Sequence, residues 1–402
     1  MAGGQGRLQA AHSSPLHKIK IPDYRGPEWC RLEISGKMSI LERSMTTTNL
    51  CVSAPGRICL FGEHQDYLGL DVIAAAINLR ITICGRKRAD LRFTIDLPDL
   101  GAAEEIVLDG ELAYANKRDY LRSVLNVLRR KGASIQSGWD VIIRGTIPIN
   151  AGTAGSSALI VAWNRFLLQA EGDPRAENPR EIAELGFLTE VVEFREPGGK
   201  MDHYTAAFGG VIWLVFDHPL KVTRLSPSLK EFVLGDSLEK KDTTGTLGSV
   251  KDKVLLGVGE IRKVLPAFSL KGPLTLEAGR EIDKLEPLVR KPLKGAFINR
   301  DLTKEGLKLF KGDFDDEQFG RLLTRQQDVL RDDLGISTPK IDRMIDSALT
   351  AGALGAKING SGGGGCMFAY APGCSGPVAE AVEKAGGRAY IIRIDDGARV
   401  EP

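Results

Sequence analysis

The sequence has little net charge, few cysteines and no long hydrophobic run, and each deficit excludes a class of protein. A formal net charge of +2 over 402 residues provides no basic surface for nucleic acid or for an acidic membrane. No apolar segment approaches the length of a transmembrane helix, and the N-terminus lacks the continuous apolar stretch of a secretion signal. We therefore expect a cytoplasmic protein with neither a nucleic-acid nor a membrane partner.

The six cysteines include no Cys-x-x-Cys pair. Cys51, Cys59 and Cys84 lie within apolar, strand-like runs, where a free thiol packs as a small hydrophobic side chain. The pattern predicts free, buried thiols at these three positions and fits a reducing compartment.

The chain is too long for one simple core, and its composition is that of an ordinary globular protein, with 43% hydrophobic and 26% charged residues. A change in composition near 217–230 is the candidate domain boundary. We predict a poorly defined N-terminal extension over 1–46, an N-terminal domain over 47–217 and a C-terminal domain over 218–402. No internal repeat is visible.

Hydrophobic periodicity predicts both strands and helices, which indicates an α/β or α+β protein. The predicted strands are 50–61, 72–85, 139–146 and 211–216, and the predicted helices are 119–131, 180–195, 251–265 and 316–334.

The segment 150–157 is a run of small residues placed directly before an apolar helical pattern. Gly152 and Gly155 let backbone N–H groups turn inward without obstruction from a Cβ atom. The helix start behind them adds unpaired N–H groups and the positive end of a helix dipole. The segment therefore predicts an anion cradle, typically for phosphate, although an isolated loop of this kind can be an ordinary helix-capping turn.

A second motif places Glu63, His64 and Asp66 directly after an apolar strand. These side chains offer several hydrogen-bond donors and acceptors to a polyhydroxylated ligand. A capped turn is the simpler alternative. A metal site formed by His64, Asp66 and the distant His203 is another, and it would suit a metal-dependent hydrolase.

The third motif, at 357–370, contains four consecutive glycines between apolar, strand-like flanks. The flanks argue against a flexible linker and favour a close backbone approach to another loop or to a ligand.

In their order and spacing along the chain, the three motifs resemble the GHMP small-molecule kinase superfamily, over roughly residues 50–400. The segments 55–57 and 62–67 resemble the galactokinase sugar-site signature, and 396–400 resembles the galactokinase C-terminus. The phosphate loop and the four-glycine cluster are closer to fucokinases and heptose-phosphate kinases, and His203 stands where glutamine is usual. The resemblance implies an α+β, two-domain fold with the active site in the cleft between the domains.

The resemblance further implies an ATP-dependent sugar kinase that uses Mg²⁺, with galactose as the first candidate substrate and a sugar 1-phosphate as product. Kinases of L-fucose, L-arabinose or a heptose phosphate are the alternatives within the superfamily. A non-catalytic sensor of sugar and ATP is an alternative of another class. The expected partners are a small-molecule sugar and ATP, in a monomer or homodimer.

Site residues follow from the same resemblance. Asp202 would face the attacking hydroxyl, with Arg57 beside it, and the guanidinium would keep that carboxylate charged. Ser157 and Glu190 would hold Mg²⁺, with Glu193 as the fallback. The other sugar hydroxyls would be bound by Glu63, His64, Asp66 and Asp236, and the ATP phosphates by Asn150, Ala151, Gly152, Thr153, Ala154, Gly155, Ser156 and Ser157.

Overall fold

A computed structural model describes residues 49–149, 151–239 and 243–402. The predicted N-terminal extension and Asn150 lie outside the described residues. None of the helices within these ranges is long and apolar enough to cross a membrane.

The larger of two sheets has eight strands and carries the first two motifs. Its main path runs β12-β1-β2-β5-β3-β4, and β6 pairs with β2 while β7 pairs with β6. β1 and β2 are long antiparallel partners because both are rich in β-branched and small apolar residues. The strands are β1 (Asn49–Phe61), β2 (Val72–Lys87), β3 (Arg92–Leu97), β4 (Ala102–Val107), β5 (Trp139–Gly145), β6 (Val211–Val215), β7 (Lys221–Leu225) and β12 (Arg399–Val400).

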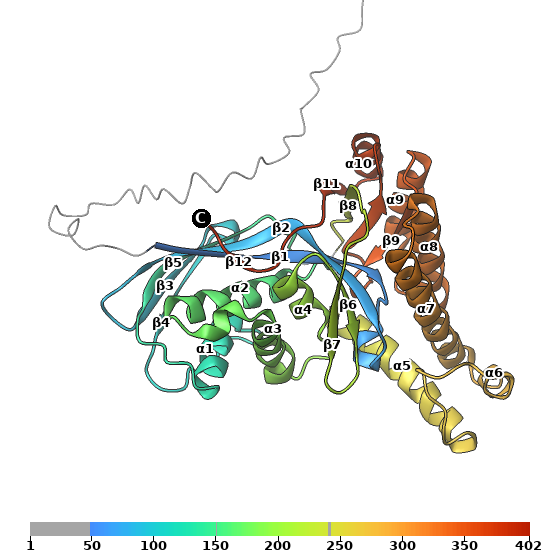
Figure 1. Cartoon of the computed structure of the whole chain (residues 1–402), viewed down its shortest axis with the longest axis horizontal. Helices are drawn as coiled ribbons and strands as arrows, with labels where there is room; N and C mark the ends of the chain where they lie inside the picture. Colours follow the sequence, from blue (N-terminus) through green and yellow to red (C-terminus); the bar gives the residue numbers. More distant parts are fainter. Residues whose placement is uncertain (1–48, 150, 240–242) are drawn as a thin grey trace, which may run out of the picture. The chain divides into compact units, whose positions relative to one another are not determined.

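Helices α1 to α4 cover one face of this sheet (Figure 1). The side chains of Asp119 and Asn178 accept backbone hydrogen bonds at the N-termini of α1 and α3, which explains where these helices begin. Trp163 and Phe166 of α2 are fully buried against the sheet. The helices are α1 (Tyr120–Arg130), α2 (Gly155–Ala170), α3 (Pro179–Phe187) and α4 (Met201–Phe208).

The second sheet is antiparallel, with the order β11-β8-β10-β9, and it presents the third motif. The four-glycine cluster forms the turn between β9 and β10. The strands are β8 (Phe232–Asp236), β9 (Gly355–Asn359), β10 (Cys366–Tyr370) and β11 (Arg388–Ile392). The accompanying helices are α5 (Thr243–Val264), α6 (Leu276–Asp283), α7 (Pro287–Lys311), α8 (Asp316–Asp328), α9 (Pro339–Thr350) and α10 (Ser375–Lys384).

The chain returns to the larger sheet after building the second one. β12 pairs with β1, and the buried Arg80 holds the segment before it by donating to Asp395 Oδ2 at 2.8 Å. β7 also belongs to the larger sheet, although it follows the predicted boundary at 217. That boundary stays a prediction.

The prediction of free thiols at Cys51 and Cys84 is wrong, because the two form a disulfide. They are directly opposite one another in the antiparallel register of β1 and β2. The strand register brings together two residues that are 33 positions apart in the chain, and hydrophobic patterning contains no information on that register. The sequence analysis therefore could not reveal the bond. Cys59 is buried as predicted, and its thiol donates to the carbonyl of Phe61.

Candidate active site

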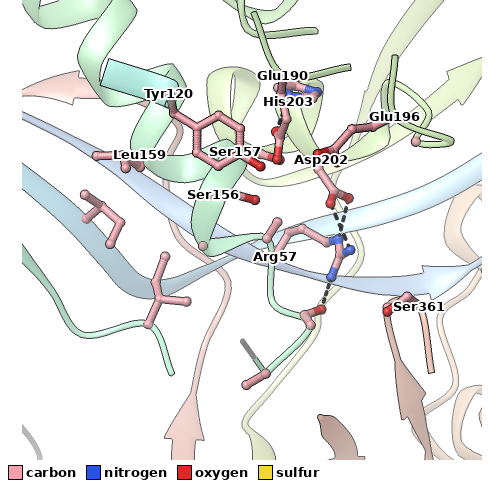
Figure 2. A pocket seen from close by; sticks show the side chains of 18 of the residues that line it. Arg57, Tyr120, Ser156, Ser157, Leu159, Glu190, Glu196, Asp202, His203 and Ser361 are labelled. Carbon is pink, nitrogen blue, oxygen red and sulfur yellow. Dashed lines mark hydrogen bonds and ion pairs between the residues drawn. The ribbon is translucent and has the colours of Figure 1, made fainter. Parts of the chain in front are cut away.

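The three motifs meet at a cavity of about 480 Å³ (Figure 2), which is within the range of small-molecule sites. Its walls come from the end of β1, the loop before α2 and the segment 190–203. Leu247, Gly360 and Ser361 contribute from the other half of the chain. Residues far apart in the sequence therefore line one space.

The glycine loop opens onto this cavity at the start of α2. Ala154 precedes the helix in the left-handed conformation, with φ of 59°, and its side chain provides no cap for the first turn. The backbone N–H groups of that turn therefore lack a side-chain cap, as an anion site requires. All described loop residues line the cavity except Thr153, whose side chain is buried.

Arg57 and Asp202 form a bidentate ion pair at the cavity wall (Figure 2). Arg57 Nε lies 2.8 Å from Asp202 Oδ1, and Nη2 lies 3.1 Å from Oδ2. Arg57 Nη1 also donates to the carbonyl of Gly152 in the glycine loop. Burial by itself lowers the pKa of Arg57, but the negative charges of Asp202 and Glu63 raise it by a larger amount. The net pKa is therefore raised, and the guanidinium stays protonated.

Ser157 and Glu190, the two predicted metal ligands, are in contact. Ser157 Oγ donates to Glu190 Oε2 at 2.7 Å, and His203 Nε2 lies 2.7 Å from the same oxygen. Burial raises the pKa of Glu190, but the hydrogen bond from His203 and the serine hydroxyls more than offset it, so the pKa is lowered and the carboxylate is ionised. A hydroxyl and an ionised carboxylate are oxygen ligands of the kind that Mg²⁺ prefers, so these residues fit the ion.

Glu190 is the better placed of the two candidate acids on this segment. It lies in the π-helical turn Leu188–Val192 that continues α3, and it lines the cavity. The carboxylate of Glu193 instead bonds to Tyr114 and, at 2.7 Å, to Arg130, and Glu193 is not among the lining residues.

Asp66 lines the cavity near Asp202. Its carboxylate accepts hydrogen bonds from the backbone N–H groups of Tyr67 at 2.9 Å and Met201 at 3.4 Å. Burial and the charge of Asp202 raise the pKa of Asp66 to about 6. Gly199 is required beside it, because a Cβ atom there would lie 1.9 Å from Asp66 Oδ2.

Glu63 and His64 also line the cavity, but protein groups already engage their polar atoms. Glu63 Oε2 accepts from Lys357 Nζ at 2.7 Å, and Oε1 accepts from Gly360 N at 2.8 Å. His64 Nε2 lies 3.1 Å from the Ser361 carbonyl, and burial lowers the pKa of His64 to about 4. Their predicted contacts with sugar hydroxyls stay predictions.

The predicted role of Asp236 at the sugar finds no support in the geometry. Asp236 ends β8, its Oδ1 accepts from the backbone N–H of Leu238 at 2.9 Å, and it is not among the residues that line the cavity. The alternative metal site is also unsupported, since the described ranges contain no group of three or more His, Cys, Asp or Glu residues arranged to hold a metal.

The third motif packs on the glycine loop through Asn359 and Gly360, whose contacts the sequence did not reveal. Asn359 Nδ2 donates to the Gly152 carbonyl at 2.9 Å, and Asn359 Oδ1 accepts from Cys59 N at 2.9 Å. A Cβ atom on Gly360 would lie 2.6 Å from the Gly152 carbonyl oxygen. The expected close backbone approach is thus confirmed, and its partner is the phosphate loop.

The remaining lining residues divide into a polar and an apolar group that the sequence analysis also missed. Arg118 and Glu196 form an ion pair in this lining, and Tyr120 lies close to Ser157 (Figure 2). The apolar group consists of the side chains of Ile81, Leu97, Leu100, Ile143, Ile147 and Leu159. These positions come from strands, helices and connections and share no distinctive motif, so only their spatial convergence identifies them.

Family profiles match three segments of the chain. The profile "GHMP kinases N terminal domain" matches 119–210, "GHMP kinases C terminal" matches 306–387, and "Galactokinase galactose-binding signature" matches 42–87. The segments include the phosphate loop, the four-glycine cluster and the end of β1.

Known proteins match almost the whole chain. The mevalonate kinase of Thermococcus gammatolerans is 30% identical over 361 residues, which cover 87% of this chain and 97% of the relative. The galactokinase of Pasteurella multocida is 28% identical and covers 82% of this chain and 87% of its own. The crystal structure of Lactococcus lactis galactokinase with galactose has a TM-score of 0.75 at 24% identity, covering 87% and 95% of the two chains. The predicted α+β, two-domain fold is confirmed.

Proposed function

Because the chain belongs to the GHMP kinase family, whose members are ATP-dependent small-molecule kinases, we propose that it phosphorylates a hydroxyl group of a neutral sugar, with galactose as the first candidate. The observation that carries the proposal is the Arg57–Asp202 pair. It joins the cavity wall to the glycine loop through Gly152, next to the carboxylate of Asp66.

In the proposed reaction Asp202 orients the sugar hydroxyl and accepts its proton. The hydroxyl oxygen then bonds to the γ-phosphorus of ATP, and the bond to the β–γ bridging oxygen breaks to release ADP. Arg57 holds the Asp202 carboxylate in place through two hydrogen bonds and stabilises the charge that develops during transfer. Mg²⁺ held by Ser157 and Glu190 would neutralise charge on the phosphates, and the uncapped start of α2 would bind the phosphate oxygens.

The charges around Asp202 favour a neutral acceptor over an anionic one. Asp66 accompanies Asp202, while Arg57 is already paired and the charge of Glu63 is balanced by Lys357. The other two cations among the described lining residues lie beside acids, Arg118 with Glu196 and Arg144 at 3.7 Å from Asp99. A carboxylate or phosphate on the acceptor would therefore meet a net negative wall.

Coupled measurement of ADP release across a substrate panel tests this proposal. The panel contains galactose, L-fucose, L-arabinose, galactosamine, galacturonate, heptose phosphates and mevalonate. We expect turnover of a neutral sugar with the highest kcat/KM. A preference for mevalonate or a phosphorylated sugar would overturn the acceptor class, and Lys251, whose Nζ lies 5.7 Å from the ring centre of Tyr67, would then be the first candidate anion ligand.

The sensor alternative makes a different prediction for the same panel. A sensor binds a sugar and ATP in calorimetry but releases no ADP. The intact Arg57–Asp202 pair argues against it, because a protein that only binds has no need of a charged carboxylate beside the attacking hydroxyl.

A further inference from the structure

His203 lies beside the proposed metal ligand Glu190 in the cavity wall and is almost completely buried, at 1% exposure. It follows Asp202 in the first turn of α4. Its Nε2 atom is 2.7 Å from Glu190 Oε2, the oxygen that also accepts from Ser157 Oγ (Figure 2). A buried imidazole therefore contacts the carboxylate that would bind the metal.

Packing fixes the orientation of the His203 ring. A Cβ atom on Gly186 would lie 2.9 Å from His203 Cδ2, so the ring needs a glycine there. Phe187 meets it edge to face, with the ring centres 6.2 Å apart. Nδ1 is buried without a hydrogen-bond partner among the described residues. In this ring orientation the imidazole therefore makes its polar contact through Nε2, with Glu190.

We propose that His203 is a positioning residue for Mg²⁺, whose Nε2–H group holds the Glu190 carboxylate in the orientation that the ion requires. The inference rests on the proposed function, which assigns Mg²⁺ to Ser157 and Glu190. Outer hydrogen bonds to metal ligands typically affect metal affinity by about 10–100-fold. A glutamine side chain would carry an amide N–H at a similar reach.

Two amide substitutions distinguish the contribution of Nε2 from that of Nδ1. The Gln side-chain nitrogen takes the place of Nε2, whereas the shorter Asn nitrogen takes the place of Nδ1. The dissociation constant of ATP is measured by calorimetry with Mg²⁺ and with EDTA, and the ratio gives the contribution of the metal. We expect His203→Gln to keep this ratio within about threefold of wild type, and His203→Asn to reduce it about 10–100-fold while metal-free ATP binding stays unchanged.

Thr205→Val is the matched control. Thr205 is buried on the same helix, and its hydroxyl donates to the Met201 carbonyl, away from Glu190. The metal ratio should be unchanged in this variant. If His203→Asn does not fold, His203→Leu replaces it, since leucine fills a similar volume and donates no hydrogen bond.

Retention of the full metal ratio in His203→Asn or His203→Leu would overturn the inference. Failure of the proposed function gives a different result. In that case Ser157→Ala and Glu190→Gln would also leave the ratio unchanged, because the metal would be bound elsewhere or not at all.

Discussion

Two ion pairs of similar chemistry lie beside the candidate site, and they differ in exposure. Arg57–Asp202 lies at the cavity wall, where the Asp202 side chain is 29% exposed. Lys357–Glu63 lies in the contact between the second and third motifs, where the side chains are 0% and 1% exposed. The first pair can exchange part of its contacts for a substrate, whereas the second cannot do so without opening the core.

Because of this difference in exposure, we expect substitutions in the first pair to reduce mainly activity and substitutions in the second pair to reduce mainly the stability of the fold. Removing one partner of a fully buried pair leaves an uncompensated charge and costs about 3–5 kcal/mol. A partly exposed carboxylate costs less to remove, because water replaces some of the lost contacts. Substitutions in the two pairs should therefore differ in whether they mainly lower kcat or the free energy of unfolding.

Asp202→Asn should have the largest effect, on activity. Without a base at the attacking hydroxyl, kcat on the best sugar should fall about 10³-fold. The free energy of unfolding should fall by only about 1–2 kcal/mol, since the amide still contacts Arg57. Coupled ADP release and urea unfolding measure the two quantities. A variant with near-normal turnover would remove Asp202 from the mechanism.

Lys357→Met should have the largest effect on stability, about 3–5 kcal/mol in urea unfolding, because Glu63 would be left buried and unpaired. The double variant Lys357→Met/Glu63→Gln should recover part of this loss. Lys384→Met is the matched control, since Lys384 pairs with Glu380 at the surface with the two side chains 74% and 65% exposed. A loss of stability no larger than in this control would show that the buried pair does not hold the motifs together.

Gly360→Ala should destabilise the contact between the two glycine loops by about 1–3 kcal/mol. Its φ of 80° is unfavourable for alanine, and the new Cβ atom would lie 2.6 Å from the Gly152 carbonyl oxygen. Gly155→Ala provides the comparison, because the nearest atom to its Cβ is 3.6 Å away and the residue begins α2. Thermal unfolding should rank Gly155→Ala at or slightly above wild type, and equal melting temperatures of the two variants would contradict the assigned contact.

Asp66 should give a small pH effect on stability. Because its pKa in the folded state is raised to about 6, the folded protein holds this proton at a pH where the unfolded chain has released it. The stabilisation by the bound proton is present below about pH 4 and is lost as the pH rises to about 6. Asp66→Asn removes this step, so its stability relative to wild type should increase by about 1–3 kcal/mol between pH 4 and pH 7. A pH-independent difference in unfolding free energy would contradict the raised pKa.

Much of the local structure could be predicted from the sequence. Runs rich in Val, Ile and Cys identified β1 and β2, which are buried along most of their length, and helical periodicity identified α1, which buries one face. The phosphate loop was recognisable because its small residues form one continuous run directly before a helical pattern. The contacts of Arg57 with Asp202 and of Ser157 with Glu190 were expected only through the family resemblance.

The sequence by itself determined the elements, the three motifs and the chemical types of the residues at the site, since these depend on neighbours along the chain. Only the tertiary structure decided which side chains face the cavity and which are used up in holding it together. Glu63 and Asp66 are three positions apart and both line the cavity, yet Glu63 is paired with Lys357 while Asp66 accepts hydrogen bonds from backbone N–H groups. Lys357 lies 294 residues from Glu63 in the chain, and Cys51 and Cys84 are joined only through strand register. Such pairings depend on the free energy of packing distant segments together, which no local pattern encodes.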